Sequence, residues 1–519
     1  MMMPAHCPGH IGWPPARWVL LAAAIPALWA CNARRLVKPQ PAPSQTFSEL
    51  YKQAVNRNID IVFEVDNSVS MQPEQANLAT NFPAFINILK KVSGGLPNVH
   101  IAVVTSNMGA GAFSSQIMGC ENPDNGSFVD QSRFATDPVC ATAKLNAGQH
   151  FIESLNGGAQ NNFGGNITDV FRCIAQVGTD GCGFEDHLES VRAALGDETG
   201  NPGHDIPVRP IPPNNEGFLR SDAYLAVILI TNEEECSSAP DNVLYDSTNN
   251  APAALGPLLD RCFAHTDICD GQRVINYVNA GTPVGPFQNC VSDETTFNSD
   301  PTHGAIPVQF YIDYFNHLKS DTSKILLSGI IAPPGPYSLV LVPDQQGGMV
   351  LAQGNSCTGA AGVFGQPTPR LTKFFGAFPP QQVVTTSICD QSFAAAMQRI
   401  AEAISTRIGS PCVVGKVLDA NGAVWTPTAT TLPDCVVIDH QTNASGVVVD
   451  TTLPPCPVSQ TTGTTACWHL DAGGMTCPGD FAMGFSRPGA ALPTDLNSSI
   501  SCSVLACPPA GTANPPPGC

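Results

Sequence analysis

The residues that decide the fold are IDIVFEV at positions 59–65 and the DNSVS that follows at positions 66–70. The first run consists almost entirely of β-branched and apolar residues, which is typical of a strand buried on both faces of a parallel sheet. The second run is short and polar, so we expect the chain to turn there. Together the two runs predict an inner strand of an α/β sheet that ends in a polar loop.

The same apolar signal returns further along the chain, and segments with helical spacing separate its occurrences. Strands are predicted at 100–105, 223–230, 324–331 and 383–388, and helices at 76–91, 166–177, 185–195 and 393–408, the first of them interrupted by Pro83. Strands that alternate with helices are typical of a doubly wound, mostly parallel α/β sheet. The stretches 109–150, 237–301 and 333–369 lack either period, so we expect insertions or long loops held by disulfides.

Composition and charge narrow the classes of partner. The 519 residues are too many for one ordinary core, and we expect two main domains, 58–410 and 411–519. Hydrophobic residues make up 43% of the chain, which is enough for a buried core. The formal net charge of -19 would repel phosphate backbones, so no nucleic-acid partner is expected, whereas an acidic surface suits cations.

The N-terminal residues indicate export. Arg17 precedes an apolar run at 19–28 that is too short to span a bilayer, and Ala30-Cys31 follows it. This pattern resembles a bacterial lipoprotein signal, in which residues 1–30 are removed and Cys31 is lipidated. The protein would then attach to the outer membrane or cell surface of a Gram-negative cell through its lipid alone. The alternative is an ordinary cleaved signal peptide and a secreted protein. Residues 31–57, which begin with a Pro-rich stretch, are expected to form an extended tether.

Twenty cysteines agree with export, because free thiols are normally oxidised to disulfides only outside the cytosol. Apart from Cys7 and Cys31, a boundary near Ser410 leaves ten before it and eight after it, so both parts can pair internally. Metal ligation is the alternative, but no CxxC pair occurs and no spacing fits a zinc site. We therefore expect disulfides of undetermined connectivity, and a small Cys-rich β module after residue 411 with Trp468 in its core.

The segment 60–71 resembles the first strand and metal loop of von Willebrand factor type A domains. Their DxSxS motif is matched by Asp66, Ser68 and Ser70. One carboxylate and two hydroxyls on a tight turn are oxygen ligands of the kind that Mg²⁺ prefers, with Mn²⁺ or Ca²⁺ as alternatives. In an open α/β sheet such a loop lies at the carboxyl ends of the strands, where ligands bind. A Ser-rich helix cap without metal is the alternative interpretation.

The resemblance implies two further metal ligands, and this chain departs from the family at both. The family places an Asp after the strand that neighbours the first one, and here Asn232 follows the run 226–231. It also uses a Thr from a loop before a helix, where Glu185 is nearest and Thr179 is a weaker candidate. An amide adds no negative charge, so affinity for a cation should be lower. Residues 233–235, all Glu, either compensate or form a solvated acidic loop, and Glu185 is alternatively a first-turn residue that the helix dipole stabilises.

The resemblance covers about 58–407 and implies a function in binding rather than catalysis. The metal face would bind a protein or other extracellular ligand, with an acidic group of the ligand completing the coordination. The lipoprotein signal and the Cys-rich tail make the chain similar to surface or periplasmic lipoproteins of myxobacteria and related bacteria.

Two alternative functions stay open. One is a structural envelope protein without a specific ligand. The other is a secreted hydrolase, but GFSRPG at 484–489 only loosely matches a nucleophile elbow. EDHLE at 185–189 contains residue types that could serve as ligands, although we expect it at the surface.

Overall fold

The computed structural model describes residues 44–52, 57–92, 96–134, 137–200, 206–240, 242–246, 255, 258–295, 304–343, 348–408, 412–413, 415–427, 430–442, 447–456, 466–472, 481–486 and 497–506. The predicted signal peptide, the lipidation residue Cys31 and the Pro-rich start of the tether lie outside these ranges. Within them, no helix is both long enough and apolar enough to cross a membrane.

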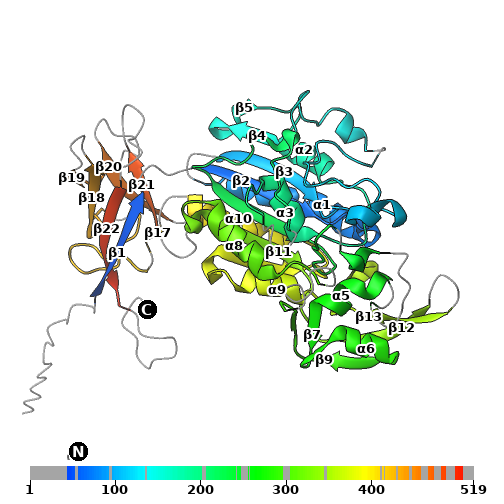
Figure 1. The fold of residues 1–519 in the computed structure, drawn as a ribbon. Helices are drawn as coiled ribbons and strands as arrows, with labels where there is room; N and C mark the ends of the chain where they lie inside the picture. The colour runs from blue at the N-terminus through cyan, green and yellow to red at the C-terminus, as the bar shows by residue number, and fades with distance from the viewer. Residues whose placement is uncertain are drawn as a thin grey trace, which may run out of the picture.

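A seven-stranded sheet in the order β16-β11-β6-β2-β3-β4-β5 forms the centre of the larger part of the molecule (Figure 1). Five strands pair in parallel: β2 (Asn58–Val65), β3 (Asn98–Thr105), β6 (Tyr224–Ile230), β11 (Ile325–Ile331) and β16 (Val383–Ser387). At the β3 end of the sheet, β4 (Ile152–Leu155) and β5 (Gln160–Asn161) continue it with antiparallel pairing. The chain runs from β2 to β3 on one side and returns to β6 on the other. The strand order therefore reverses between β2 and β6, and the predicted mostly parallel α/β sheet is confirmed.

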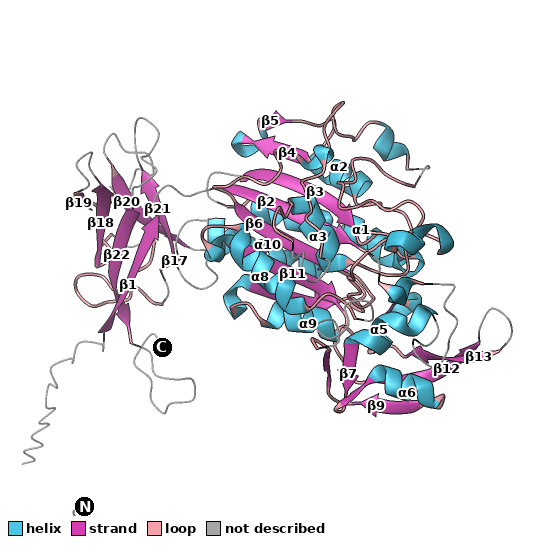
Figure 2. Cartoon of the chain, in the orientation of Figure 1, coloured by secondary structure: helices cyan, strands magenta, loops and turns pink. Residues whose placement is uncertain are grey.

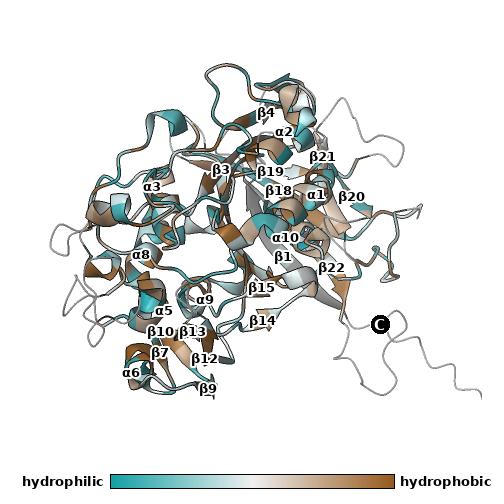
Figure 3. Ribbon diagram, turned by 90° about the vertical axis from the view of Figure 1, so that its right-hand side faces the viewer, coloured by the Kyte–Doolittle hydropathy of each residue, from teal (hydrophilic) through white to brown (hydrophobic). Residues whose placement is uncertain are grey.

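Helices cover both faces of this sheet (Figure 2). One core contains α1 (Gln72–Leu89), α2 (Ile167–Ile174) and α10 (Ala394–Ile408), and the other contains α3 (His187–Leu195), α8 (Val308–Leu318) and α9 (Pro369–Gly376). Successive side chains of a strand point to opposite faces, so a strand between two cores must be apolar along its whole length. Apolar residues accordingly concentrate on the strands, while the surrounding loops are more hydrophilic (Figure 3).

The first helix runs through Pro83 rather than stopping there. It begins at Gln72, with Pro73 in its first turn, where the missing N–H has no helical partner to lose. Pro83 removes one hydrogen bond from the interior of the helix. The neighbouring aromatic residues Phe82 and Phe85 are buried against Phe63 of β2, and this packing offsets the loss.

The stretches predicted as insertions contain short elements that pack together. The stretch 237–301 holds α5 (Arg261–Thr266), β7 (Asp267–Cys269), β8 (Gln272–Arg273), α6 (Val274–Ala280), β9 (Val284–Phe287) and β10 (Cys290–Ser292). The stretch 333–369 holds β12 (Tyr337–Pro343), β13 (Met349–Gln353) and the hairpin of β14 (Cys357–Thr358) and β15 (Phe364–Gly365). β9 pairs with β12, so these two stretches join in one sheet. Phe263, Phe287 and Tyr337 belong to the small core between them. We call this unit, residues 258–295 and 337–353, the insertion subdomain.

Disulfides are confirmed. All ten cysteines between residues 58 and 410 pair with one another, as Cys120–Cys182, Cys140–Cys173, Cys236–Cys262, Cys269–Cys290 and Cys357–Cys389. Two further disulfides, Cys435–Cys502 and Cys456–Cys467, lie after residue 411. Most of the first five connect a long irregular stretch to a helix or to another loop, which is where a chain with little regular structure benefits most from a cross-link.

The residues after 411 form two antiparallel sheets. Their strands are β17 (Cys412–Val413), β18 (Cys435–Thr442), β19 (Val448–Leu453), β20 (Cys467–Ala472), β21 (Phe481–Ser486) and β22 (Asn497–Leu505). Trp468 is 2% exposed in the core between them.

The N-terminal tether is shorter than predicted, because Ser44–Lys52 form β1 and pair antiparallel with β22. The prolines of the predicted tether all precede Ser44. The backbone of 44–52 is therefore free to donate and accept the hydrogen bonds of a sheet.

Candidate functional site

The predicted metal loop lies where the strand order reverses. Asp66 follows β2 and is fully buried. Its Oδ1 accepts a hydrogen bond from the Ser68 backbone N–H at 2.7 Å, and its Oδ2 accepts one from Thr231 Oγ1 at 2.8 Å. Thr231 follows β6, so the loops after the two neighbouring strands are joined through this one carboxylate. In open α/β sheets this position, outside the carboxyl ends of the strands, is where ligands bind.

The structure brings the other predicted ligands to the same place. Ser68 Oγ and Ser70 Oγ are 3.1 Å apart, and Ser70 Oγ lies 3.1 Å from Asn232 Oδ1. Ser70 Oγ is also 3.3 Å from Glu233 Oε1. The hydroxyls of one loop therefore face the amide and carboxylate oxygens of the other, as expected for a shared set of oxygen ligands.

Glu185, the residue predicted nearest to the expected Thr position, lies with this group. Its carboxyl forms a hydrogen bond with the carboxylate of Glu233. Burial, Glu233 and Asp66 raise the pKa of Glu185 well above its ordinary value, so Glu185 holds the proton of this pair. Burial and Asp66 raise the pKa of Glu233 to about 7. Glu185 Oε1 is buried without a hydrogen-bond partner.

The prediction that EDHLE at 185–189 lies at the surface is wrong. Glu185, Asp186 and Glu189 are each at most 4% exposed, and His187 is fully buried. The helix α3 begins only at His187, so Glu185 precedes its first turn. Several of these polar groups pair with distant residues, such as His187 with Glu64 and Glu189 with Tyr311, and periodicity cannot reveal such contacts.

A solvated loop at 233–235 is also excluded, because Glu234 is 2% exposed and Glu235 is fully buried. Glu235 Oε2 accepts a hydrogen bond from the Leu188 N–H in the first turn of α3, at 2.9 Å. Glu234 Oε2 accepts one from the Arg370 N–H in the first turn of α9, at 3.2 Å. Helix N-termini carry unpaired N–H groups and a partial positive charge, so both carboxyl groups cap helices. Burial nevertheless raises the pKa of Glu234 to about 8.

A buried pair that was not predicted lies behind the metal loop. Glu64 of β2 and His187 of α3 are both fully buried, with Glu64 Oε1 3.0 Å from His187 Nδ1. Burial alone would lower the pKa of His187, but Glu64, Asp66 and Glu235 raise it to about 10. Glu64 therefore favours the protonated imidazolium of His187, and the pair ties α3 to β2.

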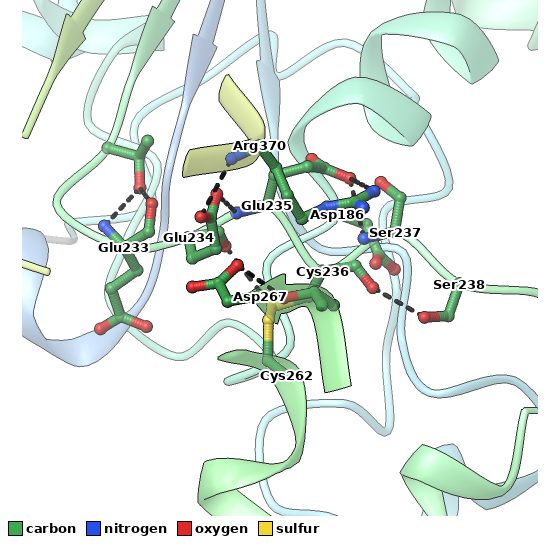
Figure 4. Close-up of a disulfide and its surroundings, with 12 residues drawn as sticks. Asp186, Glu233, Glu234, Glu235, Cys236, Ser237, Ser238, Cys262, Asp267 and Arg370 are labelled. Atoms are coloured by element: carbon green, nitrogen blue, oxygen red, sulfur yellow. Dashed lines mark hydrogen bonds and ion pairs between the residues drawn. A yellow bond between two sulfur atoms is a disulfide. The ribbon is translucent and has the colours of Figure 1, made fainter. Parts of the chain in front are cut away.

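A cavity of about 550 Å³ opens over these residues. Strand-end residues line one side of it, including Ser68, Glu185 and Glu233, together with Thr179, the weaker candidate for the Thr position. The insertion subdomain lines the other side with Phe263 and Gln353, next to the Cys236–Cys262 disulfide (Figure 4). None of the described residues lining the cavity is Lys, Arg or His.

Gly181 allows two loops to meet at this cavity. Its N–H donates to the Asn67 carbonyl at 2.9 Å. A Cβ at this position would lie 2.3 Å from Asn67 Oδ1, so a larger residue would push the loop before α3 away from the metal loop.

The oxygen atoms at this site fit a hard divalent cation. Among the described residues, no group of three or more His, Cys, Asp or Glu side chains is arranged to hold a metal ion. The set here is of a different kind, because it mixes carboxylates with two hydroxyls and an amide, all of them oxygen ligands. The unpaired Glu185 Oε1 and the close contact between Glu185 and Glu233 are features that a cation would stabilise.

The Cys236–Cys262 disulfide is expected to hold the insertion subdomain over the cavity. It connects the end of the β6 loop to α5 across 26 residues. The double variant Cys236→Ala/Cys262→Ala should lower the free energy of unfolding by about 2–4 kcal/mol. It should also speed hydrogen exchange in α5 more than in β2.

The matched control is Cys140→Ala/Cys173→Ala, whose disulfide spans 33 residues at α2. It should lower stability by a similar amount and leave the exchange of α5 unchanged. If α5 is equally protected from hydrogen exchange in the two double variants, the Cys236–Cys262 disulfide does not hold the insertion subdomain in place.

No family model matches the chain, and no curated protein sequence matches it. Among solved structures, the chain is similar to the open conformation of the pilus adhesin SpaC from Lactobacillus rhamnosus GG, with 12% identity, 92% of this chain and 43% of that chain covered, and a TM-score of 0.28. It is also similar to the pilus adhesin RrgA from Streptococcus pneumoniae, with 12% identity, coverages of 89% and 58%, and a TM-score of 0.19. The chain spans about half the length of these adhesins, and TM-scores this low do not establish a common fold.

Proposed function

We propose that the chain is a ligand-binding protein of the bacterial cell envelope, without enzymatic activity, whose residues 58–410 form a von Willebrand factor type A-like domain. The domain binds a divalent cation, Mg²⁺ or alternatively Mn²⁺ or Ca²⁺, and through it a protein ligand. One observation carries the proposal. Asp66, Ser68 and Ser70 after β2 meet Asn232 and Glu233 after β6 at the point where the strand order reverses.

Each predicted residue has a defined part in this site. Asp66, Ser68 and Ser70 would hold the cation, with the amide oxygen of Asn232 beside them. Glu233 would supply the negative charge that Asn232 lacks, and Glu185 would contribute a further carboxyl oxygen, so the two acidic residues would compensate for the Asn at that position. A cation bound here would offer an acidic group of the protein ligand an open coordination position.

The surrounding residues keep the metal loop in place without a cation. Gln75 Nε2 of α1 donates to the Asp66 carbonyl at 3.2 Å and to the Gly178 carbonyl at 2.8 Å. Thr231 and the Ser68 N–H fix the two carboxylate oxygens of Asp66. The loop is therefore preorganised, so cation binding would require little further ordering of the chain.

The proposal also covers the location of the protein in the cell envelope and its lack of enzymatic activity. The lipoprotein signal places the domain outside the cytoplasm, attached through lipid on Cys31. The nucleophile-elbow alternative loses its support, because Ser486 is the last residue of β21 and pairs antiparallel with Cys467 of β20. A nucleophile elbow needs a sharp turn from a strand of an α/β sheet into a helix.

Calorimetric titration of the full chain with Mg²⁺ tests this function, beside Asp66→Asn and Ser68→Ala. We expect wild type to bind and Asp66→Asn to bind at least about tenfold more weakly, because ligand charge sets the affinity of such sites. The amide introduced by Asp66→Asn keeps an oxygen for the Ser68 N–H and removes a buried charge, so this variant should fold. The exposed Glu216→Gln is the matched control and should bind as wild type does.

Thermal unfolding provides the second readout. A ligand that binds only the folded state at a hundred times its Kd stabilises it by about 2.7 kcal/mol, so Mg²⁺ should raise the Tm of wild type and EDTA should reverse the effect. No heat and no stabilisation at millimolar Mg²⁺, or equal binding by all variants, would contradict the proposed function.

A further inference from the structure

The cavity extends past the proposed cation position toward the insertion subdomain. Glu234, Phe263 and Gln353 line this part, which we call the inner wall. None of the three belongs to the proposed set of cation ligands. The whole cavity, about 550 Å³, falls in the range of sites that enclose ligand groups. The inner wall therefore has room for a chemical group beside the cation position.

Gln353 is the feature of the inner wall that points to a ligand. This residue ends β13 and is 9% exposed, yet neither its Nε2 nor its Oε1 has a hydrogen-bond partner of good geometry. Gln353 is close enough to the Tyr337 hydroxyl to lower the pKa of that tyrosine, which burial raises. A buried amide without hydrogen-bond partners is destabilising, because both groups have lost their bonds to water. A ligand group in the cavity would supply the missing partners.

The charges around the cavity indicate which kind of group this is. The acidic residues that line it are Asp180, Glu185, Glu233 and Glu234, and no described lining residue is basic. Arg370 does not line the cavity, and its guanidinium donates to the Ile306 carbonyl at 2.6 Å. Asp267 lies beside Glu234 and adds a further carboxyl group. The described lining is therefore rich in carboxyl groups and has no basic side chain, which favours a cation over an anion.

The mouth of the cavity has the character of a protein contact. Val69 and Met118 line it and are 82% and 88% exposed, far more than large apolar residues usually are. Val69 lies between the two predicted serine ligands, so a partner that reaches the cation must cover it. Exposed apolar side chains at a cavity are typical of a site that a protein segment covers.

We propose that the inner wall, formed by Glu234, Gln353 and Phe263, binds a positively charged side chain, Lys or Arg, of the protein partner. The carboxyl group of Glu234 and the Oε1 atom of Gln353 accept hydrogen bonds from the ammonium or guanidinium group. The inference deepens the proposed function by naming a second feature of the partner, but the subsite itself does not require the metal. A partner segment would then carry a basic residue near the group that completes the cation site.

N-acetyl-argininamide tests the subsite, with N-acetyl-citrullinamide as its uncharged isostere. Both are titrated into the full chain by calorimetry at fixed ionic strength, with EDTA and with saturating Mg²⁺. We expect the arginine probe to bind under both conditions and the citrulline probe to bind at least about tenfold more weakly, which corresponds to one charge-assisted hydrogen bond.

Three variants separate the subsite from the cation position. Glu234→Gln and Gln353→Leu should each weaken binding of the arginine probe about tenfold and leave Mg²⁺ affinity unchanged. Asp66→Asn should weaken Mg²⁺ binding and leave binding of the arginine probe unchanged. Gln353→Leu keeps the side-chain volume and removes only unpaired polar atoms, so it should fold even if Glu234→Gln does not.

Four results would overturn the subsite: no binding of the arginine probe, equal binding of both probes, displacement of the probe by Mg²⁺, or unchanged binding in both wall variants. If wild type binds the arginine probe but does not bind Mg²⁺, the result would instead contradict the proposed function and support the subsite.

Discussion

Arg192→Met is expected to lower the free energy of unfolding by about 3–5 kcal/mol, because it leaves buried carboxylates without their partner. Arg192 of α3 is fully buried. Its Nη2 lies 2.6 Å from Glu189 Oε1 and its Nη1 lies 2.8 Å from Asp197 Oδ2. Glu189 also accepts a hydrogen bond from the Tyr311 hydroxyl of α8, so the cluster joins two helices on one face of the sheet.

Urea denaturation of wild type and variant measures this effect. Arg209→Met is the matched control, because Arg209 contacts the same Glu189 at 2.7 Å but its side chain is 22% exposed. We expect the control to lose about 1 kcal/mol or less, as partly solvated ion pairs do. Similar losses of unfolding free energy in the two variants would show that burial does not determine how much Arg192 contributes to stability.

Phe63→Ala is also expected to lower the free energy of unfolding by about 3–5 kcal/mol, because it leaves a cavity in the core beneath the metal loop. Phe63 is fully buried in β2, three positions before Asp66. Its ring centroid lies 4.7 Å from that of Phe171 and 5.8 Å from that of Phe85, so strand and helices meet at this side chain. The variant should therefore also weaken Mg²⁺ binding, because β2 carries the first ligands.

Denaturation and Mg²⁺ titration of the same samples check both effects. Phe134→Ala is the control, because Phe134 lies half-buried in a loop away from β2. Phe134→Ala should lower the free energy of unfolding by less than half as much as Phe63→Ala does, and it should leave Mg²⁺ affinity unchanged. A loss in Phe63→Ala no larger than that of the control would mean that the aromatic cluster does not hold β2 in position.

The central sheet was predictable because its signal is local. The runs 59–65, 100–105, 223–230, 324–331 and 383–388 consist largely of β-branched and apolar residues, and each became a strand within one or two residues of its predicted bounds. Such runs are apolar because both faces of the sheet are covered. The position of the candidate site followed from the same signal, since loops after neighbouring parallel strands meet at one edge. Asp66, Ser68 and Asn232 do meet there.

What the sequence did not reveal depends on contacts between distant segments. Glu234 and Glu235 are buried because they cap α9 and α3, and nothing in the local pattern marks a Glu as a cap for a remote helix. The insertion subdomain combines short elements from separate stretches around one core, and runs of two to seven residues carry no clear period. The strand β1 gains its hydrogen bonds from β22, more than four hundred residues away.

Anomalous X-ray scattering from crystals of the full chain grown with Mn²⁺ tests the central claim most directly. We predict one strong Mn²⁺ peak beside Ser68 Oγ and Ser70 Oγ, at the edge of the sheet between β2 and β6, and no peak there in Asp66→Asn crystals. Electron density for the metal loop without an anomalous peak at this position, or an Mn²⁺ ion bound only elsewhere, would contradict it.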